Sequence, residues 1–182
     1  MLILASKSPR RKELLSIITK DFTILSSNED ETLPDGLTPK EAVEYLSKIK
    51  ALPFAKDGDT VVGADTVVAI NGNILGKPEN EEDARRMFRL LSGKKHIVFT
   101  GVTVIKNGSI TTFSCETRVK FFELTDREIA DYVKTGEPMD KAGAYGIQGK
   151  GALLVEKIDG DYFNVVGLPV SLLNRHLEIQ AL

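Results

Sequence analysis

Four side chains that can bind an anion lie close together near the start of the chain: Ser6, Ser8, Arg10 and Arg11. Ser8 is placed to cap a helix that begins at Pro9, where the missing proline N–H costs nothing. A helix N-terminus presents free N–H groups and the positive end of the helix dipole, and arginine pairs well with phosphate or carboxylate. The stretch is either an anion receptor or a capped helix with two solvated arginines.

Asp65 interrupts the most apolar stretch of the chain, Thr60–Ile70. A lone carboxylate in such a stretch is costly to bury unless it is paired, bound to a metal or exposed at a cleft. The small residues Gly63 and Ala64 precede it, so a ligand could approach closely. The alternative is a strand bulge that carries a structural carboxylate, because perturbed carboxylates are not always functional.

Other charged residues could complete a site around these two features. The candidate cations are Lys50, Lys77 and Lys141, and the candidate carboxylates besides Asp65 are Glu31 and Asp140. Cations opposed to carboxylates suit a polyphosphate bound with a divalent metal cation, Mg²⁺ or Mn²⁺. The acidic loop that contains Glu31 is either a carboxylate source for that metal or a solvated turn.

Several familiar catalytic patterns are absent from the sequence. It contains no P-loop, no G-x-G-x-x-G fingerprint and no G-x-S-x-G nucleophile elbow. One cysteine and two distant histidines make a zinc site or an internal disulfide a poor fit. Hydrolysis by metal-activated water is therefore the favoured enzyme class.

The composition narrows the possible partners. The chain has 182 residues, 27% of them charged, and a net charge of −2, which argues against a broad nucleic-acid surface. The first apolar run is too short for a signal peptide or a membrane span. We therefore expect a cytoplasmic protein that binds neither nucleic acid nor a membrane.

The order of predicted elements favours one compact α/β domain over residues 1–182, with two lobes around a cleft. A strand, a helix and a strand are predicted at Leu2–Ala5, Pro9–Thr19 and Phe22–Leu25, followed by a helix from Pro39, a strand at Thr60–Ile70, a helix at Glu81–Leu91, a hairpin of Ile97–Ile105 with Ser109–Phe122, a helix after Thr125, a strand at Ala152–Ile158 and a last helix that contains Val170. Asn71-Gly72 and Asn107-Gly108 are hairpin turn signals.

A glycine-rich stretch with embedded charges spans residues 137–151. Its glycines give a flexible backbone that could wrap a ligand, and a loop of this length in a small domain is often functional. A plain surface loop is the alternative.

Four blocks of the sequence together resemble the Maf family of nucleoside triphosphate pyrophosphatases. They are ASKSPRRKELL at 5–15, GADTVV at 63–68, GKP at 76–78 and DKAGAYGIQG at 140–149. The resemblance covers nearly the whole chain. It implies a long twisted mixed sheet flanked by helices, as in inosine triphosphatases, and metal-dependent hydrolysis of a nucleoside triphosphate to the monophosphate and pyrophosphate.

The resemblance also implies roles for individual residues. Asp65 would accept a proton from the attacking water, and Glu31 would be a metal ligand. The substrate-binding residues would be Ser8, Arg10, Arg11, Lys50, Thr66, Lys77, Lys141 and Gln148. Arg11, Thr66 and Gln148 resemble the set found in the branch that acts on dTTP and UTP, with modified pyrimidine nucleotides as further candidate substrates.

A second reading of the resemblance is not enzymatic. The family name records an association with septum formation, so a nucleotide-binding regulatory protein of cell division is the alternative. A homodimer is also plausible by resemblance.

Overall fold

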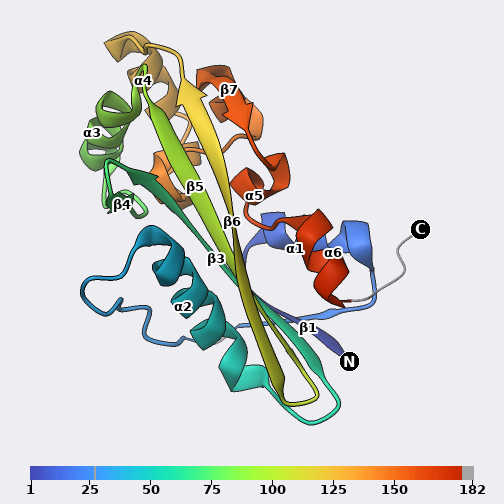
Figure 1. Cartoon of the computed structure of the whole chain (residues 1–182). Helices are drawn as coiled ribbons and strands as arrows, with labels where there is room; N and C mark the ends of the chain where they lie inside the picture. The colour runs from blue at the N-terminus through green and yellow to red at the C-terminus, as the bar shows by residue number, and fades with distance from the viewer. Residues whose placement is uncertain (27, 178–182) are drawn as a thin grey trace. The chain divides into compact units, whose positions relative to one another are not determined.

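The computed structural model describes residues 1–26 and 28–177 of the chain (Figure 1). Its strands are β1 (Leu2–Ala5), β2 (Thr23–Leu25), β3 (Thr60–Ile70), β4 (Asn73–Leu75), β5 (Lys95–Lys106), β6 (Ser109–Phe121) and β7 (Val155–Asp159). Its α-helices are α1 (Pro9–Ile18), α2 (Pro39–Ala51), α3 (Glu81–Leu91), α4 (Asp126–Val133), α5 (Tyr162–Val166) and α6 (Val170–Leu177), with 3₁₀ turns η1 (Leu52–Phe54), η2 (Glu137–Asp140), η3 (Ala142–Ala144) and η4 (Gly149–Leu154). None of the helices in this described part has the length and apolar character needed to cross a membrane.

The strands form one mixed sheet in the order β2-β1-β3-β5-β6-β7, with β4 paired to β3. Strand β1 is parallel to both β2 and β3, whereas β4 and β7 run antiparallel to β3 and β6. Both hairpin turns adopt the positive φ angles predicted from their Asn-Gly pairs, 51° and 79° at residues 71 and 72 and 50° and 77° at residues 107 and 108. The predicted α/β class with a mixed sheet flanked by helices is confirmed.

The chain divides into two compact units. Unit 1 consists of residues 1–66, 100–115 and 167–182, and unit 2 consists of residues 67–99 and 116–166. Strands β3, β5 and β6 each contribute residues to both units. The single domain over 1–182 and the cleft between two lobes stay predictions.

In unit 1, helix α2 packs unusually close to β3 and β5, while α1 and α6 lie on the other side of these strands (Figure 1). A Cβ at Gly63 would overlap the Ser47 carbonyl oxygen and lie 2.9 Å from the Ala51 Cβ. A Cβ at Gly101 would overlap the Val43 carbonyl. The two strand glycines thus leave room for the backbone of the helix.

The helical spacing of Val43, Leu46, Ile49 and Leu52 predicts the buried side of α2, but the structure differs from this stripe because the helix packs so close to the strands. Val43 and Leu46 are buried as expected, but Ile49 is half-buried and Leu52 is exposed. The small residues Ser47 and Ala51 face the strands instead, because only short side chains fit where the helix approaches the glycines.

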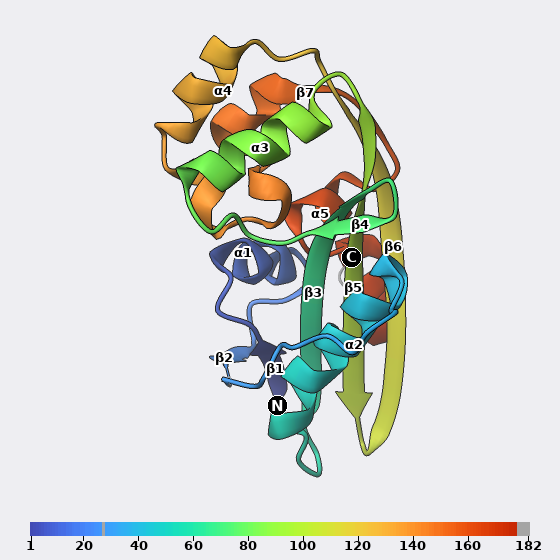
Figure 2. The same ribbon diagram turned by 90° about the vertical axis from the view of Figure 1, so that its left-hand side faces the viewer.

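In unit 2, helices α3 and α4 lie side by side against the ends of β3, β5 and β6 (Figure 2). Sixteen buried residues form the core, and Phe88, Phe121 and Tyr132 are among the largest. Phe88 and Tyr132 contact edge to face, with ring centroids 5.4 Å apart, a favoured arrangement of aromatic pairs.

The structure differs from the sequence-based expectation at two places in the C-terminal third. The predicted strand Ala152–Ile158 begins only at Val155, because residues 149–154 form 3₁₀ turns. Helix α5 was not predicted, since its five residues are too few to show a helical period.

The glycine-rich stretch is folded rather than flexible. Gly143 donates its N–H to the Gly76 carbonyl at 2.9 Å and lies against the Val68 side chain. Gly146 donates its N–H to the Tyr132 hydroxyl at 3.2 Å, and Gly151 lies against the Gly146 carbonyl. These glycines permit close contacts, so the segment is held in one conformation.

The buried imidazole of His96 makes the stability of unit 2 depend on pH. His96 is 2% exposed, its Nε2 lies 2.8 Å from the Tyr145 hydroxyl, and burial lowers its pKa to about 4. As the pH falls below 6.5, the unfolded chain binds a proton at His96 before the folded chain does, so stability is lost between pH 6.5 and 4. From pH 7 to pH 5, we expect the free energy of unfolding to fall by about 2 kcal/mol more in the wild type than in His96→Gln.

Urea denaturation at the two pH values measures this difference. Glutamine does not titrate but can still pair with the Tyr145 hydroxyl, so it isolates the contribution of the imidazole from that of the carboxylates. Parallel pH profiles for the two proteins would contradict the prediction.

Candidate active site

The N-terminus of α1 carries the first group of candidate residues. Ser8 is the N-cap, and its hydroxyl accepts the N–H of Arg11 at 3.4 Å, with Pro9 in the first turn. The Ser6 hydroxyl accepts the N–H of Ser8 at 3.2 Å. The predicted cap is confirmed, and the two hydroxyls lie at the positive end of the helix dipole.

Arg11 is held by three different segments of unit 1. Its Nε donates to the Gly167 carbonyl at 2.9 Å, its Nη2 donates to the Thr66 hydroxyl at 3.0 Å, and its Nη1 donates to the Ser6 hydroxyl at 3.4 Å. Each of these bonds uses a separate N–H of the planar guanidinium. Arg11 therefore has a fixed orientation and is not a solvated arginine, which was one of the two readings of this stretch.

The charges around Arg11 form one cluster. Burial lowers the pKa of Arg11 below its ordinary value, the Asp65 carboxylate offsets part of this effect, Arg10 adds to it and Glu31 opposes it. Arginine stays protonated despite such a shift. The cluster thus holds cationic and anionic groups within range of one another.

Asp65 forms an ion pair with Lys50, and this pair compensates the charge of a carboxylate that lies in an apolar strand. The Lys50 Nζ lies 2.5 Å from Asp65 Oδ1 and 3.1 Å from Glu31 Oε2. The side chain of Asp65 is 12% exposed and that of Lys50 is 18% exposed, whereas Glu31 is 59% exposed. The close approach of α2 to β3 puts Lys50 within reach, and the pairing keeps a buried charge compensated.

The same two carboxylates fit a divalent metal. Asp65 and Glu31 both place an oxygen next to a single cationic centre, the Lys50 ammonium. Mg²⁺ is commonly bound by one or two carboxylates together with substrate phosphates and water. The described residues contain no cluster of three or more His, Cys, Asp or Glu side chains that could hold a metal.

Unit 2 carries the remaining predicted residues. Lys77 is exposed in the connection from β4 to α3, directly after Gly76, whose carbonyl accepts the Gly143 N–H at 2.9 Å. This bond ties the Lys77 segment to the glycine-rich segment. The structure therefore brings two of the sequence blocks together within unit 2.

Lys141 makes contacts within its own segment. Its Nζ donates to the Glu137 carbonyl and to Asp140 Oδ1, both at 2.6 Å, and its side chain is 16% exposed. The Lys141 side chain also lies over Gly146, where a Cβ would be 2.7 Å from its Cε. These contacts give Lys141 a structural role in the segment, and its predicted contact with substrate stays a prediction.

Gln148 is exposed at the start of η4, between a buried residue and a tightly held turn. Ile147 is 6% exposed, and Gly149 has a φ of +64°. The Glu137 carboxylate accepts the N–H of Lys150 at 3.3 Å, and a Cβ at Gly149 would lie 3.0 Å from it. The backbone around Gln148 is thus fixed while its side chain is presented to solvent.

Within unit 1 the structure gathers Ser8, Arg10, Arg11, Glu31, Lys50, Asp65 and Thr66, and unit 2 contains Lys77, Lys141 and Gln148. Sequence reasoning missed two residues of the cluster, Thr100 and Gly167. The Thr100 hydroxyl lies 2.9 Å from the Thr66 hydroxyl, and Gly167 supplies the carbonyl that binds Arg11. A threonine directly after the apolar run Ile97–Phe99 is the available sequence signal for Thr100, whereas a backbone carbonyl such as that of Gly167 leaves no signal in the sequence.

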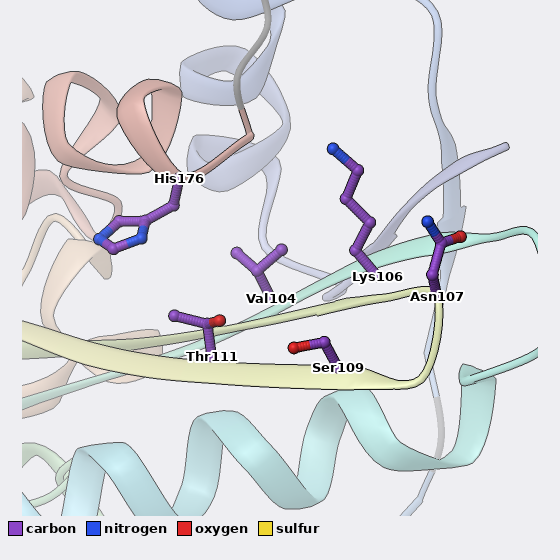
Figure 3. Close-up of a pocket in the computed structure, with 6 residues that line it drawn as sticks. All are labelled: Val104, Lys106, Asn107, Ser109, Thr111 and His176. Atoms are coloured by element: carbon purple, nitrogen blue, oxygen red, sulfur yellow. The ribbon is translucent and has the colours of Figure 1, made fainter.

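A cavity of about 380 Å³ lies elsewhere in unit 1 (Figure 3). It is lined by Val104, Lys106, Asn107, Ser109, Thr111 and His176. Figure 3 shows the His176 side chain reaching from α6 toward the β5–β6 hairpin, where its ring stacks on Phe113 with centroids 4.0 Å apart. None of the predicted site residues lines this cavity.

Comparison with known proteins shows that a single family model matches nearly the whole chain. The family model described as "Maf-like protein" matches residues 1–180. A Geobacillus sp. (strain WCH70) protein named "dTTP/UTP pyrophosphatase" is 53% identical over 172 residues, covering 93% of this chain and 92% of its own length. A Bacillus pumilus protein of the same name is 52% identical over 179 residues, with coverage of 97% and 95%.

A solved structure shows the same fold at low sequence identity. The structure of a HAM1 protein from Coxiella burnetii matches with a TM-score of 0.55 and 15% identity, covering 97% of this chain and 98% of that one. This likeness concerns the fold alone.

The Lys50–Asp65 pair can be tested by its effect on stability. Lys50→Met leaves the largely buried Asp65 carboxylate without its closest partner, and we expect the free energy of unfolding to fall by about 2 kcal/mol. Breaking a fully buried pair costs about 3–5 kcal/mol, and partial exposure reduces this figure. Urea denaturation at pH 7 measures the change.

The double variant Lys50→Met/Asp65→Asn removes both charges and should be more stable than Lys50→Met alone. Lys48→Met, an exposed substitution in the same helix, is the matched control and should change stability by less than about 0.5 kcal/mol. Purely additive effects of the two substitutions would show that the pair is not coupled.

Proposed function

Because the chain belongs to the Maf-like protein family, we propose that it is a nucleoside triphosphate pyrophosphatase that hydrolyses dTTP and UTP. The observation that carries this proposal is the charged cluster of unit 1. In this cluster the Asp65 and Glu31 carboxylates both contact the Lys50 ammonium, and both interact electrostatically with Arg11. Relatives about half identical over nearly the whole chain bear the name dTTP/UTP pyrophosphatase, which supports this choice of substrate.

The triphosphate is bound by the cationic groups in this proposal. Ser8 and Arg10 lie at the start of α1, where free N–H groups and the helix dipole favour phosphate oxygens. Arg11 is already oriented by its contacts, so binding costs it little conformational entropy. Lys50, Lys77 and Lys141 add positive charge, which favours the pyrophosphate leaving group.

Asp65 is the general base. In the proposed step it accepts a proton from a water molecule, the water oxygen bonds to the α-phosphorus, and the bond from the α-phosphorus to the bridging oxygen breaks. The products are the nucleoside monophosphate and pyrophosphate, so one water is consumed for each triphosphate. The Lys50 Nζ, 2.5 Å from Asp65 Oδ1, holds the carboxylate that accepts this proton in place.

A divalent cation, Mg²⁺ or Mn²⁺, would be held by Glu31 and Asp65 together with phosphate oxygens. It would supply charge neutralisation and polarisation of the phosphates. Lys50 contacts both carboxylates, so it keeps them close together until such a cation binds.

In this proposal Thr66 and Gln148 form hydrogen bonds with the pyrimidine ring of the nucleotide, and Arg11 holds the Thr66 hydroxyl in place. Thr66 is half-buried and accepts a hydrogen bond from Arg11, whereas Gln148 is exposed and offers both a donor and an acceptor. Canonical and modified pyrimidine nucleotides are both candidate substrates.

Residues 1–182 act as a single domain in this proposal, and the cytoplasm is the proposed location of the protein.

Pyrophosphate release from a panel of nucleoside triphosphates with Mg²⁺ or Mn²⁺ tests the proposal, with products identified by chromatography. We expect monophosphate and pyrophosphate from dTTP and UTP. In Asp65→Asn, kcat should fall at least about 100-fold, because a general base contributes about 10²–10⁴-fold, while the Kd for nucleotide should stay within a few-fold of the wild type.

Asp57→Asn is the matched control, since it makes the same substitution at an exposed position and should leave kcat unchanged. Wild-type activity in Asp65→Asn would remove Asp65 as the base. Nucleotide binding without any hydrolysis by the wild type would instead favour the alternative of a nucleotide-binding regulatory protein of cell division.

A further inference from the structure

The hydroxyl of Thr66 is engaged by two partners within unit 1. Arg11 Nη2 lies 3.0 Å from it, and the Thr100 hydroxyl lies 2.9 Å from it. A threonine hydroxyl can donate one hydrogen bond and accept two, whereas arginine can only donate. Arg11 therefore occupies one acceptor position of Thr66, and Thr100 takes either the second acceptor position or the only proton.

The contact from Arg11 is not free to rearrange. Its Nε is bound at 2.9 Å to the carbonyl of Gly167. Gly167 has a φ of +132°, which side-chain-bearing residues rarely adopt, so the position of this carbonyl depends on glycine. With Arg11 held in this way, Thr66 has a single hydrogen bond left to offer a ligand, and the orientation of the Thr100 hydroxyl decides whether Thr66 donates or accepts it.

The two threonines differ in exposure. Thr100 is fully buried, at 0% exposed, while Thr66 is only half-buried. Thr100 is thus placed to act on a ligand through Thr66 and not by contact.

We propose that Thr100 is a positioning residue that determines base specificity by fixing the hydrogen-bond role of Thr66. This inference rests on the proposed function, in which Thr66 contacts the pyrimidine. Thymine and uracil present an oxygen acceptor at position 4, where cytosine presents an amino donor. A hydroxyl restricted to donating fits the first two bases and leaves the cytosine amino group without a partner.

A preference for dTTP and UTP selects one of the two arrangements. Thr100 donates to Thr66, both acceptor positions of Thr66 are then filled, and the Thr66 proton points to the oxygen at position 4 of the base. When the Thr100 hydroxyl is removed, Thr66 regains an acceptor position and can also accept from the cytosine amino group.

The test compares kcat/KM for UTP and CTP in the wild type, Thr100→Val and Thr100→Ser. We expect the wild type to prefer UTP, and Thr100→Val to lower the UTP-to-CTP ratio of kcat/KM about tenfold, the equivalent of about one hydrogen bond. Thr100→Ser keeps the hydroxyl and should retain the wild-type ratio. Circular dichroism and thermal melting report whether each variant folds.

Should Thr100→Val fail to fold, Thr100→Ala, which also lacks the hydroxyl but cannot overpack the site, is expected to lower the ratio in the same way. An unchanged ratio in the folded hydroxyl-free variant overturns the proposal, as does an equal loss in the valine and serine variants or a wild type that treats UTP and CTP alike. If the wild type hydrolyses neither nucleotide, the proposed function fails separately. The ratio of Kd values for UTP and CTP, measured by calorimetry on the same variants, then decides the role of Thr100.

Discussion

The close approach of α2 to strands β3 and β5 is the constraint on which the charged cluster depends. Gly63 and Gly101 provide the space, because a Cβ at either position would overlap the backbone of the helix. At this separation Lys50 reaches Asp65 at 2.5 Å. The same strand therefore contains the glycine that admits the helix and, two residues later, the carboxylate that the helix neutralises.

Arg11 extends this arrangement through hydrogen bonds between segments far apart in the sequence. It joins the first helix to Thr66 of β3 and to the carbonyl of Gly167. Thr66 in turn meets Thr100 of β5. Each of these groups limits the hydrogen bonds that the next one can make, so specificity for a ligand would depend on buried residues as well as on those that touch it.

In unit 2, hydrogen bonds to the backbone hold the glycine-rich segment in place. These contacts are made at Gly143 and Gly146, and the turn after Gln148 is held by the Glu137 carboxylate. A flexible segment would lose entropy on binding a ligand, whereas a segment that is already ordered pays that cost during folding. The exposed Gln148 side chain is therefore carried on a preorganised backbone.

The sequence by itself determined the local features, because they depend on neighbouring residues. These include the Ser8 cap, the two Asn-Gly turns and the apolar run that contains Asp65, together with the family resemblance of four blocks. Only the tertiary structure decided which groups satisfy one another. The sharing of Lys50 by Asp65 and Glu31, the shift of the buried side of α2, the folding of the glycine-rich segment and the hydrogen bonds of Thr100 and Gly167 arise between residues distant in the chain. No local pattern encodes such contacts, since they follow from the separation of packed elements and from hydrogen-bond capacity in a buried environment.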